Sequence, residues 1–131
     1  MPNAEVQVSL RGGEPEGAYA RYQPGDPIQG SVMIRPEADL ECRSVRARLI
    51  WHTEGTGDRD EGVIAEQVLH QGLLRANTPL HFSFSFTAAQ EPWSYAGHHI
   101  HIIWEVEIIV DVPWAKDVKG AARFVLRPSV L

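Results

Sequence analysis

The strict alternation of apolar and polar residues between Ile100 and Val112 constrains the fold of this chain more than any other sequence feature. In an extended conformation, one face of the segment is wholly apolar and carries Ile100, Ile102, Trp104, Val106, Ile108, Val110 and Val112. The other face is mostly polar and carries His99, His101, Ile103, Glu105, Glu107, Ile109 and Asp111. Because side chains alternate across a β-strand, the pattern predicts a strand with one buried face and one wet face, with Glu105 and Glu107 exposed. A strand of this length is expected to bend or to change partners partway.

Shorter segments repeat the same period of two. They predict further strands at 5–10, 28–35, 45–52, 81–86 and 122–127, separated by turn residues such as Gly12-Gly13 and Pro24-Gly25. Residues 63–74 fit either a strand or a helix of about three turns. The strand is preferred, because the polar link 53–62 would then join it to the strand at 45–51 as a hairpin.

Many short strands without a convincing helix predict an all-β fold. Each strand has one apolar face that a second sheet must cover, so we expect a two-sheet antiparallel β-sandwich rather than a barrel. The length of 131 residues is that of one domain, expected to span residues 1–131.

Composition excludes several classes of protein. The net charge is −5, from 12 basic and 17 acidic residues, and the only lysines are Lys116 and Lys119, so a nucleic-acid binder is not expected. The single cysteine, Cys42, allows no intramolecular disulfide. We also see no signal peptide and no apolar run long enough to span a membrane, which favours a cytoplasmic protein.

Five segments in this sequence resemble the arrestin family, and they occur in the family's order. The five segments are Tyr22–Val32, Val45–Leu49, Leu80–Phe86, Pro92–Gly97 and Ile102–Ile108. The first of them includes a Pro-Gly turn before a strand with a central glycine, and the fourth is a Pro-x-Ser-Tyr-x-Gly turn. The resemblance extends from about Tyr19 to Leu126, which is most of the chain.

This resemblance implies an immunoglobulin-like sandwich of the arrestin N-terminal type, as in retromer's arrestin-like subunit and bacterial sporulation-control proteins. It also implies a non-catalytic module that binds or scaffolds an unidentified protein partner or a second copy of the chain. Arrestins carry two such sandwiches with a buried charged cluster between them, and the resemblance covers one. Receptor and phosphate recognition that needs both halves is therefore not implied.

Motifs for catalysis or for a cofactor are missing from the sequence. Cys42 has no histidine marked to orient it, and no serine lies in a Gly-x-Ser-x-Gly elbow. The acidic loop 58–62 resembles a calcium loop only in two carboxylates, and Leu69 stands where the bidentate glutamate would fall. We therefore expect neither enzymatic activity nor a cofactor, and a solvated hairpin tip at 58–62.

The turn at 92–97 carries two aromatic residues, Trp93 and Tyr95. Ser94 is expected to hydrogen-bond locally and Gly97 to adopt a positive φ. One of the two aromatic rings would plug the end of the sandwich. The alternative is an exposed platform for sugar or peptide, shared with Trp114.

The cluster His98–His101 suggests a metal site. His99 and His101 lie about 6.6 Å apart on one face of a strand, and two such histidines can share zinc. If 80–86 and 100–108 form a hairpin, His81 lies roughly 17 Å away, so the ligands do not converge. His99 and His101 are thus weak metal candidates, and a small-ligand binder for carbohydrate or metal is the alternative function.

Four charged residues are the candidates for an interaction surface: Arg46, Arg48, Glu105 and Glu107. If their strands are neighbours in one sheet, the arginines and glutamates are expected to pair across it. Otherwise they form an open charged face for a partner protein or for a second copy of the chain.

Overall fold

The computed structural model describes residues 3–128, and every regular element in that range is a β-strand. The strands are β1 (Ala4–Arg11), β2 (Glu14–Glu16), β3 (Tyr19–Tyr22), β4 (Pro27–Pro36), β5 (Leu40–Gly55), β6 (Glu61–Leu74), β7 (Leu80–Thr87), β8 (Tyr95–Ala96), β9 (Ile100–Asp111) and β10 (Val118–Leu126). The described residues contain no helix long and apolar enough to cross a membrane.

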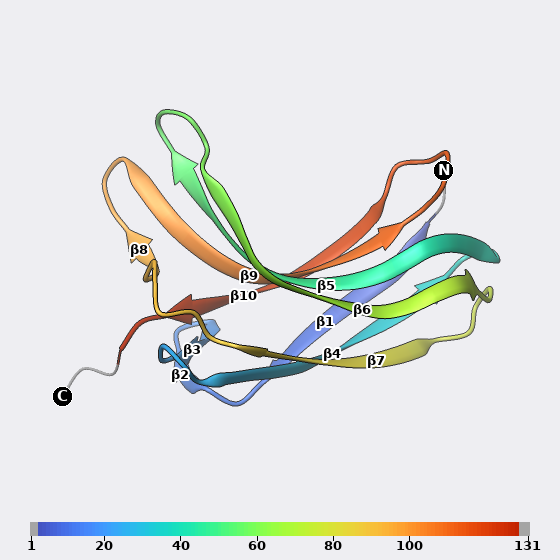
Figure 1. Ribbon diagram of the computed structural model, residues 1–131, viewed down its shortest axis with the longest axis horizontal. Helices are drawn as coiled ribbons and strands as arrows, with labels where there is room; N and C mark the ends of the chain where they lie inside the picture. Colours follow the sequence, from blue (N-terminus) through green and yellow to red (C-terminus); the bar gives the residue numbers. More distant parts are fainter. Residues whose placement is uncertain (1–2, 129–131) are drawn as a thin grey trace.

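Two sheets pack face to face in a sandwich (Figure 1). The smaller sheet has the order β1-β4-β7, and the seven-stranded sheet has the order β2-β3-β10-β9-β5-β6 with β8 added beside β9. All pairings are antiparallel except the short one between β3 and β10. Figure 1 shows that the ends of the larger sheet curve away from the smaller one, so its outer face is concave.

The inner face of β9 supplies the centre of the core. Trp104, Val106 and Ile108 are fully buried. The indole of Trp104 packs on Phe124, with ring centroids 5.9 Å apart, and its N–H donates to the Pro92 carbonyl at 2.7 Å. Trp104 therefore closes this end of the sandwich.

Burial alternates along β9 from Trp104 to Ile108 but not at its start, and Ile109 on the outer face is also buried. Ile100 is 37% exposed, so its expected burial is wrong. In Figure 1 this end of β9 rises away from the smaller sheet, which therefore does not cover it. The expected change of partner is confirmed: one edge of β9 pairs with β10 from Trp104 to Val110 and then with β8 at His101 and Ile102.

Residues 63–74 lie within β6, and the predicted hairpin with the strand at 45–51 is confirmed. The hairpin tip at 58–60 is exposed. The expected hairpin between 80–86 and 100–108 is wrong, because β7 pairs with β4 in the smaller sheet and β9 lies in the larger one.

Gly30 lies in the middle of β4, between β1 and β7. A Cβ at this position would lie 2.3 Å from the Ser9 carbonyl oxygen and 2.6 Å from the Phe84 ring. Phe84 thus occupies the space that any other side chain would need.

The turn at 92–97 differs from expectation in two respects. Ser94 bonds to the distant Leu126 backbone, with its Oγ accepting from the Leu126 N–H and its own N–H donating to the Leu126 carbonyl, both at 2.8 Å. Gly97 does not have a positive φ. Instead the Tyr95 ring lies against it, and a Cβ on Gly97 would be 2.4 Å from that ring.

Trp104→Ala should lower the free energy of unfolding by about 3–5 kcal/mol, because it removes a fully buried ring and leaves a cavity. Trp114→Ala is the matched control, since Trp114 is 100% exposed and its loss should change stability by less than about 0.5 kcal/mol. Urea unfolding measures both, and equal effects would contradict the assigned register of β9.

Candidate functional site

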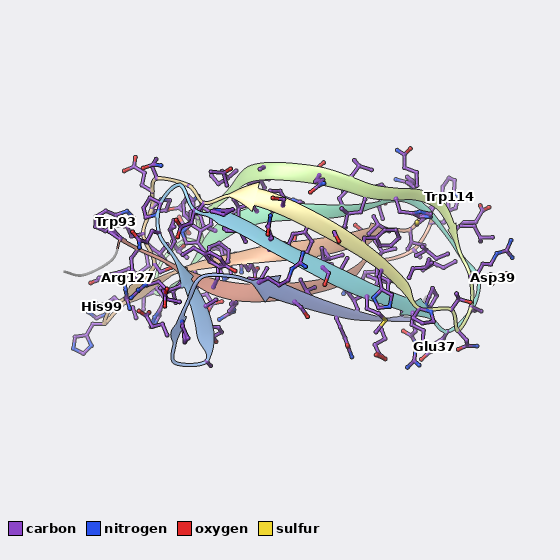
Figure 2. The ribbon with its side chains drawn as sticks, turned by 90° about the horizontal axis from the view of Figure 1, so that it is seen from below. Glu37, Asp39, Trp93, His99, Trp114 and Arg127 are labelled. Carbon is purple, nitrogen blue, oxygen red and sulfur yellow. The ribbon has the colours of Figure 1, made fainter. Side chains whose placement is uncertain are left out.

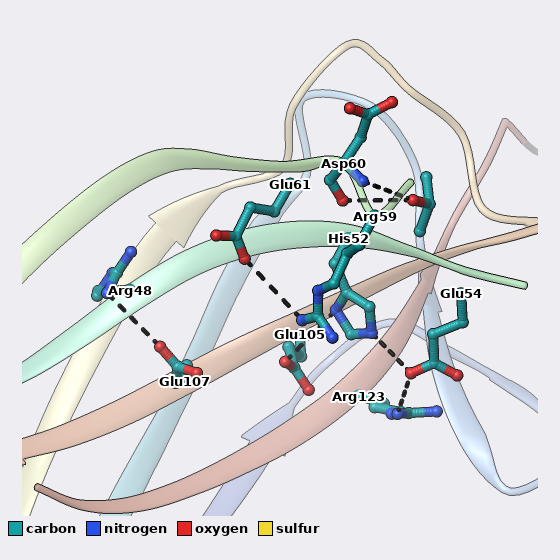
Figure 3. A network of polar contacts seen from close by, with 10 residues as sticks. Arg48, His52, Glu54, Arg59, Asp60, Glu61, Glu105, Glu107 and Arg123 are labelled. Atoms are coloured by element: carbon teal, nitrogen blue, oxygen red, sulfur yellow. Dashed lines mark hydrogen bonds and ion pairs between the residues drawn. The ribbon is translucent and has the colours of Figure 1, made fainter. Parts of the chain in front are cut away.

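The concave outer face of the seven-stranded sheet gathers charged side chains from three adjacent strands, β5, β6 and β9. We call this set the charged face: Arg46, Arg48, His52, Glu66, Glu105 and Glu107. The side chains of Glu105 and Glu107 are only 12% and 18% exposed, so their expected full exposure is wrong. Arg48 lies beside Glu107 and His52 beside Glu105 (Figure 3).

The four candidate interaction residues lie on this face, but only one of the two arginines pairs with a glutamate across β5 and β9. Arg48 lies opposite Glu107 across β5 and β9, with Nη1 3.7 Å from Oε1. Arg46 lies opposite Ile109 and turns instead to Glu66 of β6, at 3.4 Å. Glu66 also lies 3.9 Å from the Arg48 Nε and so joins the two arginines.

His52 is buried on this face between two carboxylates. Its Nε2 is 2.8 Å from Glu54 Oε2, and its Nδ1 is 3.7 Å from Glu105 Oε1. Arg123 donates to the same Glu54 oxygen at 3.1 Å (Figure 3). Hydrogen bonding from His52, with a further contribution from Arg123, lowers the pKa of Glu54.

Exposed apolar side chains border the charged face along β6. Val63, Ile64 and Val68 are 48%, 46% and 54% exposed, and Val68 lies opposite Arg46. β6 is the edge strand of its sheet, and its pairing with β5 shifts register near Ile64 and near Leu69. Such bulges oppose regular pairing along the free edge.

The aromatic residues of the 92–97 turn are both exposed. Trp93 is 52% and Tyr95 56% exposed, and the Trp93 Nε1–H donates to the nearby Gln90 carbonyl. The expectation that one of them plugs the sandwich is wrong, because Trp104 fills that place. Figure 2 places Trp114 at the opposite end of the molecule from Trp93, so the two cannot share a platform.

The histidine candidates lie apart from other metal ligands. His99 and His101 are exposed at the end of the seven-stranded sheet, whereas His81 lies opposite Met33 in the smaller sheet. Within residues 3–128, no three His, Cys, Asp or Glu side chains form a group that could hold a metal ion.

Cys42 is buried, and its Sγ donates to the Gly72 carbonyl at 3.0 Å. Burial raises the pKa of this thiol, which disfavours the thiolate that a nucleophile requires.

The charged face, and the adjoining contact between Glu54 and Arg123, contain residues that the sequence did not single out. Glu66 lies in the segment 63–74, which the sequence fits to either a strand or a helix. Its position opposite Arg48 is set by the register of β6 on β5. His52 shares the face of Arg46 and Arg48 by alternation along β5, but its burial depends on the curvature of the sheet. Glu54 and Arg123 come together from segments 69 positions apart in the sequence.

The two sheets, their strand order and the partner change of β9 define an arrestin-like β-sandwich. Among solved structures, the chain is similar to Spo0M, the sporulation control protein of Bacillus subtilis, with a TM-score of 0.73 and 17% sequence identity. The match covers 96% of this chain and 50% of the Spo0M chain, so this chain spans about half the length of that protein. No protein-family model matches the sequence, and no curated protein matches it either.

In Glu54→Gln, the free energy of unfolding should fall less steeply as the pH is lowered. The pKa of Glu54 in the folded protein lies below its usual 4.5, so its stabilising effect is present above that value and is lost as pH falls through the folded pKa. Between about pH 5 and about pH 3, the free energy of unfolding should therefore fall less in the variant. Urea titrations at several pH values measure this, with Glu41→Gln on the same strand as control. A steeper acid loss in Glu54→Gln would contradict the assigned contacts.

Removal of metal should leave the protein unchanged. Chelator treatment should not alter the melting temperature, and His99→Gln with His101→Gln should leave the fold intact, because two exposed histidines do not make a closed site. Stoichiometric zinc or nickel in protein purified without an affinity tag would contradict this and favour a metal-binding function.

Proposed function

We propose that this chain is a non-catalytic protein-interaction module that binds its partner on the outer face of the seven-stranded sheet. The observation that carries the proposal is the row of exposed apolar side chains on β6, Val63, Ile64 and Val68, beside the charged face. An apolar patch rimmed by charged groups is the usual composition of a protein interface.

The charged face suits recognition because its side chains are already held in place. Arg46 and Arg48 lie 3.4–3.9 Å from Glu66 and Glu107, so part of their side-chain freedom is already lost before binding. Charges arranged in this way contribute more to specificity and orientation than to affinity. We therefore assign the specificity of binding to Arg46, Arg48, Glu105 and Glu107, and its apolar contact area to β6.

The wider assignment rests on the fold and on the chemistry of the described residues. The arrestin-like sandwich supports a regulatory or scaffold role, and the buried Cys42 thiol gives no support to nucleophilic catalysis. The net charge of −5 gives no support to nucleic-acid binding. We propose a single domain over residues 1–131 that acts in the cytoplasm on a protein partner, which includes a second copy of the chain.

Reversal of charge on the proposed face should abolish partner binding at a modest cost in stability. Arg46→Glu with Arg48→Glu places like charges beside Glu66 and Glu107, and each lost pair should cost about 0.2–1 kcal/mol. Val68→Ser removes exposed apolar area without changing the charge and should weaken binding at nearly constant stability. Pull-down from the protein's own cells reports partners, sedimentation reports self-association, and thermal melting reports stability.

Arg35→Glu is the matched control for the charge reversal. Arg35 lies on the smaller sheet and pairs with Glu5 at 2.9 Å, so its reversal also breaks an exposed ion pair. It should lower stability by less than the double variant, because only one exposed pair is lost, and it should leave binding intact. Partners that persist in the Arg46/Arg48 variant, or that are lost equally with Arg35→Glu, would refute the proposed face.

A further inference from the structure

A groove lies at the end of the sheet where β9 and β10 separate. Beyond Trp104, β9 exchanges β10 for β8, while β10 continues to β3. The space between them has a volume of about 430 Å³, and its lining includes the apolar residues Ile102 and Val125. This volume is in the lower part of the range, roughly 300–1,000 Å³, of small-molecule sites. We propose that this groove binds a neutral saccharide of one or two rings.

Two tyrosines supply flat apolar surfaces at the groove. Tyr19 comes from β3 and Tyr95 from β8, and they are 47% and 56% exposed. Neither ring is part of the core. The Tyr95 ring lies against Gly97, and the turn before it is held by the two bonds between Ser94 and Leu126. Exposed rings on a rigid support can stack on the C–H faces of a pyranose ring while their hydroxyl groups remain hydrated.

The charges in the groove occur as acid–base pairs. Arg123 donates to Glu54 at 3.1 Å, and Arg127 forms an ion pair with Glu16. Glu16 also lies 3.7 Å from Arg21. Because each groove arginine lies beside a carboxylate, an anionic ligand such as a phosphate would be repelled by the neighbouring glutamate, whereas a neutral ligand would not. The groove therefore favours an uncharged ligand.

Neighbouring carboxylate and guanidinium groups match vicinal hydroxyl groups. A carboxylate accepts a hydrogen bond from one hydroxyl, and the adjacent guanidinium donates to the oxygen of the next. The groove has two such pairs, Glu54–Arg123 and Glu16–Arg127, together with the exposed His101. Two sets of paired groups and two aromatic rings fit a ligand with hydroxyls along its edges and apolar ring faces, which is the chemistry of a saccharide.

The groove is distinct from the surface proposed for protein binding, which it adjoins at Glu54. Figure 2 shows that Arg127 and Trp93 lie at one end of the molecule and Trp114 at the other. Trp114 is an exposed aromatic residue outside the groove and so provides a control for non-specific contact of sugars with aromatic rings.

Titration of the isotope-labelled protein with maltose, cellobiose and lactose, followed by backbone amide NMR, tests the proposal. At least one of these sugars should shift the amide resonances of Tyr19, Tyr95 and Arg123. The shifts should saturate as sugar is added and so give a dissociation constant. Tyr95→Ala should raise that constant about 3- to 10-fold through loss of stacking, and Trp114→Ala should leave it unchanged.

Two further ligands separate the saccharide from other classes. Glucose 6-phosphate should bind less well than the neutral sugars to the unaltered protein, and adenosine should not shift the same amides. Glu16→Gln leaves Arg127 without its carboxylate partner, so this variant should lose affinity for the neutral sugar and gain affinity for glucose 6-phosphate.

The proposal is overturned if none of the three sugars shifts the groove amides. It is equally overturned if glucose 6-phosphate or adenosine binds the unaltered protein more tightly than the sugars do. An equal loss of affinity in Tyr95→Ala and Trp114→Ala would also refute it, since sugar contact would then be non-specific. None of these results bears on the Arg46/Arg48 face.

Discussion

The pairing of β9 with β5 along its whole length is the constraint on which the rest of the structure depends. This register directs Trp104, Val106 and Ile108 into the core and turns Glu105 and Glu107 to the outer face. A shift by one residue would exchange the two faces and bury the carboxylates without partners. The same register places Arg48 opposite Glu107, so the core and the charged face follow from one pairing.

The curvature of the seven-stranded sheet packs the side chains of its outer face more closely than a flat sheet would. On the concave side, neighbouring side chains converge, so that Ile109 is 2% exposed and His52 3% exposed although both lie on the outer face. The charged groups there consequently lie close to one another, with Arg46, Arg48 and His52 beside Glu66, Glu107 and Glu105. The edge strand β6 adds apolar area to this ordered polar surface, and together they form the proposed docking face.

Much of the fold could be predicted from the sequence, because alternation reports burial directly. The strand at 100–112, the hairpin of 45–51 with 63–74 and the sandwich architecture follow from it. The short strands β2, β3 and β8 have too few residues for a period to show. The sheet assignment of β7 depends on packing between distant segments, and the predicted location of His81 was wrong for that reason. The site was harder to predict, because Glu66 meets Arg46 and Arg48 only through a register that bulges shift.

Partners are proposed to bind the outer face of the seven-stranded sheet and not that of the smaller sheet. Site-specific photo-crosslinking in the protein's own cells tests this most directly, with the photoreactive residue at position 68 or at position 83. Val68 is exposed on β6 beside the charged face, whereas Ser83 is exposed on β7 of the smaller sheet. Position 68 should give a discrete covalent adduct with one protein, and position 83 should give none. An adduct from position 83 alone, or from neither position, would contradict the proposal.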